Sequence, residues 1–146
     1  MKKIIIASLL LSVSFGYALN LKERKAFESW KAYLTDDIKS NSKKFKDACG
    51  YALNIDLDEK TVIPFMAYNA DSASYCDQVC GEMANMCSDA TNKASIAKNV
   101  KKMSCVLGAK GEASFALKGG VLTFKVAPGS GNIEEKAKKY LEENLN

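Results

Sequence analysis

The placement of five cysteines constrains the fold of this chain more than any other feature of its sequence. Cys76, Cys80 and Cys87 fall on one face of a predicted helix, and Cys49 and Cys105 lie outside that helix. On an intact helix, Cβ atoms four residues apart lie about 5 to 6 Å from each other, whereas a disulfide needs about 3.8 Å. Any disulfide of the central helix must therefore reach a neighbouring element of the fold.

The beginning of the chain indicates the compartment, and hence whether these cysteines pair. Two lysines, Lys2 and Lys3, precede an apolar run from Ile4 to Val13, and small residues follow up to Ala18. This order is typical of a secretory signal peptide. A spanning helix needs about 20 apolar residues, and serines and a glycine interrupt the longer stretch from Ile4 to Leu19. We therefore predict a leader over residues 1–18, export to the periplasm or the extracellular space, and no transmembrane span in the mature chain.

Export predicts disulfides, and the odd number of cysteines leaves one thiol over. Cys80 lies at the border of the apolar helix face, so it is the predicted free thiol, which would also allow a covalent dimer. The other four are predicted to pair either as Cys49 with Cys76 and Cys87 with Cys105, or as Cys49 with Cys87 and Cys76 with Cys105. The first arrangement is preferred because both of its loops are shorter. Both arrangements fix the central helix to its two neighbours.

Apolar periodicity predicts the helices. A stripe that begins at Phe27 and ends at Cys49 predicts one long helix over residues 21–49, with Gly50 as its stop. Three further helices are predicted near residues 75–87, 90–102 and 133–145. The expected N-caps are Asp71 or Ser72 for the first of these three and Asn132 for the last.

Alternation of apolar and polar residues predicts strands. Leu53, Ile55 and Leu57 alternate with polar residues, and Cys105 to Leu107 form a second short run. A Gly119-Gly120 turn predicts a hairpin in which Phe115 lies opposite Phe124 and Leu117 opposite Leu122. We therefore expect one α+β domain over residues 19–146. Its long N-terminal and central helices pack on one face of a small antiparallel sheet of three to four strands, including a C-terminal meander, and a C-terminal helix closes it.

Composition excludes several classes of function. The chain has no histidine, so Ser-His-Asp catalysis, Cys-His catalysis and His-ligated zinc sites are excluded. Loss of Lys2 and Lys3 with the leader leaves 19 basic against 17 acidic residues, a balance that does not favour nucleic acid. No cofactor-binding motif occurs, and no cofactor is predicted. We therefore expect a non-enzymatic protein.

Two alternative chemistries remain open. Cys76, Cys80, Met83 and Cys87 form a row on one helix face, and thiolate with thioether is the ligand set that favours Cu(I). A soft-metal or thiol-handling protein is the alternative that this row suggests. A carboxylate enzyme is the third hypothesis, using either Asp56 with Asp58 or Asp36 with Asp37.

Of the three hypotheses, the sequence favours the one that requires no catalytic or metal site. It predicts an exported, disulfide-stabilised domain of non-catalytic, binding or envelope-associated role, whose partner is a protein or a small ligand.

Overall fold

The computed structural model describes residues 21–58, 61, 75–108, 113–127 and 129–145. The predicted leader and the predicted N-caps Asp71 and Ser72 lie outside these residues. Within them, no helix is long and apolar enough to cross a membrane.

The first helix, α1, spans Leu21–Cys49 as predicted. Thr35 resembles an N-cap in sequence, yet its hydroxyl donates to the Lys31 carbonyl one turn back, 2.7 Å away, so the helix continues through it. Gly50 ends α1 with φ of +85°, and its N–H donates to the Lys46 carbonyl at 2.9 Å. A left-handed glycine is a common helix stop because it has no Cβ to clash.

Four strands and three further helices follow α1 among the described residues. Their order along the chain is β1 (Asn54–Leu57), α3 (Tyr75–Met86), α4 (Ala90–Asn99), β2 (Lys102–Leu107), β3 (Ser114–Lys118), β4 (Val121–Val126) and α5 (Ile133–Asn144).

The sheet is mixed, which corrects the prediction of an antiparallel sheet with a C-terminal meander. Its strand order is β1-β2-β4-β3, and both β1 with β2 and β2 with β4 run parallel. Only β3 and β4 are antiparallel, with Phe115 opposite Phe124 and Leu117 opposite Leu122, as predicted. The order has a physical reason: β2 and β4 bury alternate side chains completely, so they occupy the centre, and the half-buried β1 and β3 form the edges.

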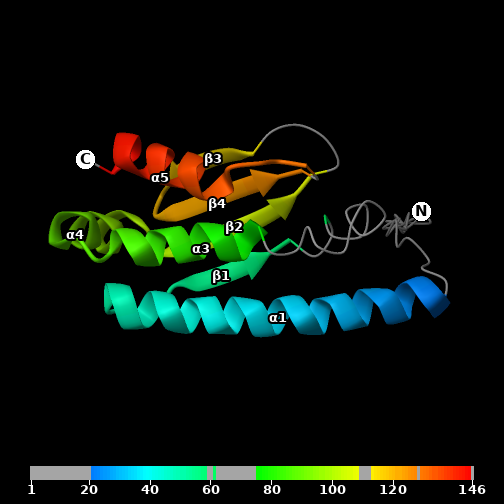
Figure 1. Cartoon of the computed structure of the whole chain (residues 1–146). Helices are drawn as coiled ribbons and strands as arrows, with labels where there is room; N and C mark the ends of the chain where they lie inside the picture. Colours follow the sequence, from blue (N-terminus) through cyan, green and yellow to red (C-terminus); the bar gives the residue numbers. More distant parts are fainter. Residues whose placement is uncertain (1–20, 59–60, 62–74, 109–112, 128, 146) are drawn as a thin grey trace, which may run out of the picture.

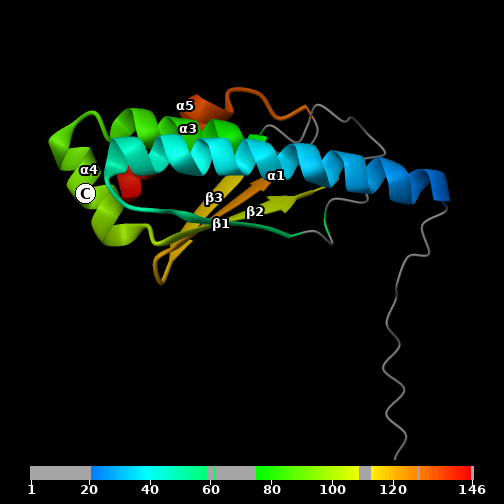
Figure 2. The same cartoon turned by 90° about the horizontal axis from the view of Figure 1, so that it is seen from below.

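The helices and the sheet form two layers. Figures 1 and 2 show α1, α3 and α5 over the same face of the sheet, with α3 between the other two. The core between the layers contains Phe45, Met83, Met103, Phe124 and Leu141, each no more than 1% exposed. The predicted packing of helices on one face of a small sheet is thus confirmed.

Two helix ends differ from the prediction. Helix α4 ends at Asn99, and the chain is already in β2 at Lys102. Asn132 precedes α5 in a left-handed conformation, and its side chain makes no capping hydrogen bond. By contrast, Asp89 caps α4, since its carboxylate accepts from the N–H groups of Thr91 and Asn92 at 2.9 Å.

Candidate functional site

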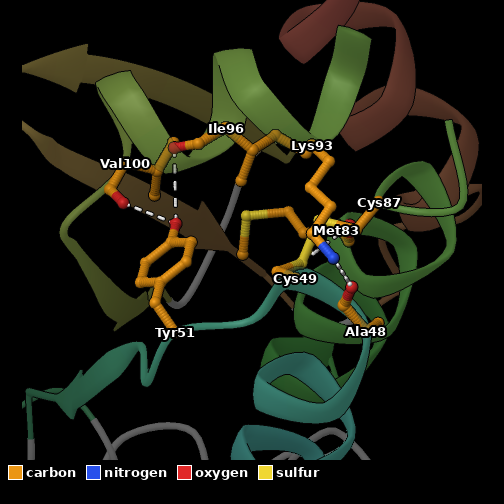
Figure 3. Close-up of a disulfide and its surroundings, with 8 residues drawn as sticks. All are labelled: Ala48, Cys49, Tyr51, Met83, Cys87, Lys93, Ile96 and Val100. Carbon is orange, nitrogen blue, oxygen red and sulfur yellow. Dashed lines mark hydrogen bonds between the residues drawn. A yellow bond between two sulfur atoms is a disulfide. The ribbon is translucent and has the colours of Figure 1, made fainter. Parts of the chain in front are cut away.

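A disulfide joins the C-terminal ends of α1 and α3. Cys49 is the last residue of α1, Cys87 directly follows α3, and their sulfurs are 2.02 Å apart (Figure 3). Both residues are buried. The two helices run in the same direction through the helix layer, so their C-terminal ends meet (Figures 1 and 2).

This pairing corrects the preferred arrangement of Cys49 with Cys76 and Cys87 with Cys105. Cys76 is in the first turn of α3, eleven residues before Cys87, which corresponds to about 16 Å along a helix. Cys49 cannot reach it from the other end of α3. The relative direction of two helices is a tertiary property, which the lengths of the connecting loops do not reveal.

Hydrogen bonds surround the disulfide and fix its corner of the fold. The Lys93 ammonium donates to the Ala48 carbonyl at 2.9 Å, which satisfies a carbonyl of the last turn of α1 (Figure 3). The Tyr51 hydroxyl donates to the Val100 carbonyl at 2.7 Å. The Tyr51 ring packs edge-on against the Phe45 ring, and the two ring centroids are 5.1 Å apart. Burial raises the pKa of Tyr51 to about 12, so the phenol stays protonated. The disulfide and these hydrogen bonds therefore have a structural role: they hold the C-terminal end of α1 against α3 and α4.

Three thiols lie in the core between helix and sheet. Cys76 and Cys80 are one turn apart on the buried face of α3, and Cys105 is on the helix-facing side of β2. Burial raises the pKa of the Cys76 thiol well above its usual value, and a hydrogen bond with Cys105 raises it further. Burial and the nearby Cys105 raise the pKa of Cys80 to about 12. The thiols of Cys76 and Cys80 are therefore uncharged and unreactive while the fold is closed.

The structure does not assemble the predicted row of soft-metal ligands. Cys87 is bonded to Cys49, so its sulfur is no thiolate, and Met83 is buried beside the disulfide. In the described part of the chain, no three Cys, Asp or Glu side chains form a group that could hold a metal ion.

Cys80 is a free thiol in the structure, together with Cys76 and Cys105. All of its side chain is shielded from solvent. A covalent dimer through Cys80 would require α3 to move away from the sheet, because a second chain cannot reach a sulfur in the core.

Three of the four carboxylates named as catalytic candidates, Asp36, Asp56 and Asp58, are exposed. Asp56 forms an exposed ion pair with Lys102 of the neighbouring strand, 3.0 Å away. The Asp36 carboxylate forms an exposed ion pair with the Lys39 ammonium on α1, and the two groups are 3.8 Å apart. Asp58 is exposed after the end of β1. Asp37 differs from the others, because it interacts with a carboxyl group that the sequence did not single out, Asp77 of α3.

Asp77 lies in an open groove between α1 and α3. The groove has a volume of about 480 Å³, and Asn41, Lys44 and Ala48 of α1 line one side. The other side consists of α3 residues, and α5 contributes Glu134. Gly81 lies on the groove floor, and a Cβ there would meet no atom within 4 Å. The groove therefore exists partly because α3 carries no side chain at this position.

Asp77 has an unusual electrostatic environment. Burial and the charge of Asp37 raise its pKa to about 6, although Asn41 and Lys44 act in the opposite direction. Its Oδ1 atom is buried and has no hydrogen-bond partner among the described residues. Asp77 precedes Gly81 by one turn on the side of α3 that lines the groove.

No protein-family model, curated protein or solved structure matches the chain.

Proposed function

We propose that this protein is an exported, disulfide-stabilised binding domain without catalytic activity, and that a basic side chain of a protein partner docks in the groove between α1 and α3. The observation that carries the proposal is the recessed Asp77 carboxyl, whose buried oxygen has no hydrogen-bond partner among the described residues.

The groove supports this proposal through its size and polarity. Its volume of about 480 Å³ lies within the usual range of ligand pockets, about 300 to 1,000 Å³. An ammonium or guanidinium group there would complete the hydrogen bonding of Asp77 and favour its charged form. Lys44 and Glu134 lie at the same groove, so both signs of charge surround the docked group.

Export is supported by two independent features. The order of charged, apolar and small residues over positions 1–18 is typical of a cleaved leader. The Cys49–Cys87 disulfide is a bond that persists in oxidising compartments.

Expression of the full chain in a bacterial host tests export. We expect the protein in the periplasmic extract or the medium, with a mass that lacks residues 1–18. A matched chain that begins with Met followed by residue 19 should stay in the cytoplasm. A cytoplasmic protein of full mass would contradict the export proposal.

Titration with two defined peptides tests the groove. The first is an end-capped Gly-Gly-Lys-Gly-Gly, and the second has norleucine in place of lysine. We expect only the lysine peptide to shift the amide resonances of α1 and α3 residues that line the groove. Binding should strengthen as the pH rises through about 6, because Asp77 then ionises.

Two variants make this test specific. Asp77→Asn should abolish the preference for lysine, and Gly81→Trp should fill the groove without altering the core, since the space beyond Gly81 is open. Gly81→Ala is the matched variant that leaves the groove free. Equal binding by the wild type and Asp77→Asn would exclude Asp77 as the recognition group.

The alternative function is soft-metal or thiol handling, and it depends on the interactions of Cys76 and Cys80 with Cys105 in the core, because no three Cys, Asp or Glu side chains of the described residues form a group that could hold a metal ion. Titration of the exported protein with Cu(I) under anaerobic conditions distinguishes the two functions. Stoichiometric binding that is lost in Cys80→Ala would favour thiol ligation over a purely structural core.

A further inference from the structure

We propose that Cys76 and Cys105 form a second disulfide, which links α3 to β2 across the core and leaves Cys80 as the single thiol of the folded chain. The inference concerns the covalent structure of the chain and does not depend on the proposed groove function.

Elimination supports this pairing. Once Cys49 and Cys87 are joined, three thiols remain among the five cysteines, all of them buried. Cys76 and Cys80 are four residues apart on the intact helix α3, so their Cβ atoms are too far apart for a disulfide. Cys105 is therefore the only cysteine that either of them can reach.

The choice between Cys76 and Cys80 rests on contact. A hydrogen bond with Cys105 is one cause of the raised pKa of Cys76, whereas Cys105 raises the pKa of Cys80 through an electrostatic interaction. Cys105 faces the helices from a central strand, between the buried residues Met103 and Leu107 on the same face. A bond from Cys105 to Cys76 therefore joins two groups that are already neighbours.

The reaction requires an external disulfide as oxidant. A thiolate of the pair attacks the oxidant and releases one thiol as a mixed disulfide forms, and the second cysteine then displaces the other thiol. The two cysteine sulfurs lose two electrons and two protons, which the oxidant takes up as two thiols. Both cysteines are buried in the closed fold, out of reach of an external oxidant, so the bond must form before α3 packs on the sheet.

Refolding followed by peptide mapping tests the proposal. The reduced, denatured chain is refolded with a mixture of reduced and oxidised glutathione, denatured again without reductant, and alkylated. We expect one alkylated cysteine per chain. Trypsin alone leaves Cys76, Cys80 and Cys87 on one peptide, because no Lys or Arg separates them. Cleavage before Asp77 and after Glu82 places each of the three on its own fragment.

Each result decides the question. A Cys76 fragment joined to the peptide that contains Cys105, with alkylated Cys80, supports the proposal. Three alkylated cysteines, or a Cys80–Cys105 link, would overturn it. Cys80→Ala should have no alkylated cysteine, and Cys105→Ala should have two. Because the assay reads covalent bonds in denatured chains, a variant of low stability still gives an answer once it has been refolded.

Discussion

Asp77 illustrates how the properties of one side chain depend on the neighbouring helix. Its own element is amphipathic and places it on the polar side, where an aspartate is usually ionised and solvated. The approach of α1 buries one of its oxygens and places Asp37 beside it. The raised pKa is therefore a consequence of the α1–α3 contact.

The Asp77 pKa predicts a pH dependence of stability. A carboxyl whose folded-state pKa is raised, here from 3.8 to about 6, is protonated more easily in the folded state. The free energy that protonation of Asp77 adds to the folded state is fully present below pH 3.8 and is lost as the pH rises through about 6. Asp77→Asn should therefore stabilise the protein above pH 6, by up to about 1 kcal/mol because the group is only partly buried.

Urea unfolding between pH 4 and pH 8 measures this effect. The gain of Asp77→Asn over the wild type should grow with pH between these limits. Asp36→Asn serves as the comparison, because Asp36 is exposed and forms an ion pair with Lys39 along the helix. A gain that does not vary with pH would show that Asp77 carries no shifted pKa.

Tyr51 is the residue that connects the disulfide corner to α4 and the chain that follows it. Its hydroxyl donates to the Val100 carbonyl, and the Ile96 carbonyl lies 3.3 Å away. Tyr51→Phe removes the hydroxyl that donates to these two carbonyls. Because a buried acceptor then loses its donor, we expect a loss of about 1 to 2 kcal/mol in the free energy of unfolding. Thermal or urea denaturation measures the loss, and an unchanged stability would show that solvent replaces the hydroxyl.

At the scale of elements, α3 has two faces with separate roles. Its buried face carries Val79, Met83 and the cysteines into the core, and its other face forms the groove floor with Asp77 and Gly81. The clean division follows from the helical period, and both faces can therefore be altered independently.

Substitution of two glycines, Gly81 and Gly120, tests whether the space beyond Gly81 is open. Gly81→Ala should stabilise the protein by about 0.5 to 1 kcal/mol, because Gly81 is in a helix and its Cβ would meet open space. Gly120→Ala should destabilise it, because Gly120 has φ of +80° and its Cβ would lie 3.2 Å from the Lys101 side chain. Unfolding midpoints of the two variants should shift in opposite directions, and a loss of stability in Gly81→Ala would contradict an open groove.

At the scale of the whole molecule, the disulfide links elements that are distant in sequence. It closes a loop with a sequence separation of 38, for which chain entropy predicts a stabilisation of about 4 kcal/mol. The double variant Cys49→Ala/Cys87→Ala should lose this amount in urea unfolding. A loss below about 1 kcal/mol would show that helix packing alone holds the corner together.

Sequence by itself determined the elements and the local pairings. The period of the apolar stripe located α1 and its stop at Gly50, and the turn Gly119-Gly120 located the β3–β4 register. These features depend on residues a few positions apart, so their physical causes are visible in a linear pattern.

Only the tertiary structure decided the sheet order, the partner of Cys49 and the environment of Asp77. The parallel pairing of β2 with β4 depends on which strands bury most apolar surface beneath the helices. The Cys49–Cys87 bond depends on the common direction of α1 and α3, and the pKa of Asp77 depends on their contact. Each is set by the relative placement of segments far apart in the chain, and that placement minimises the free energy of the whole core.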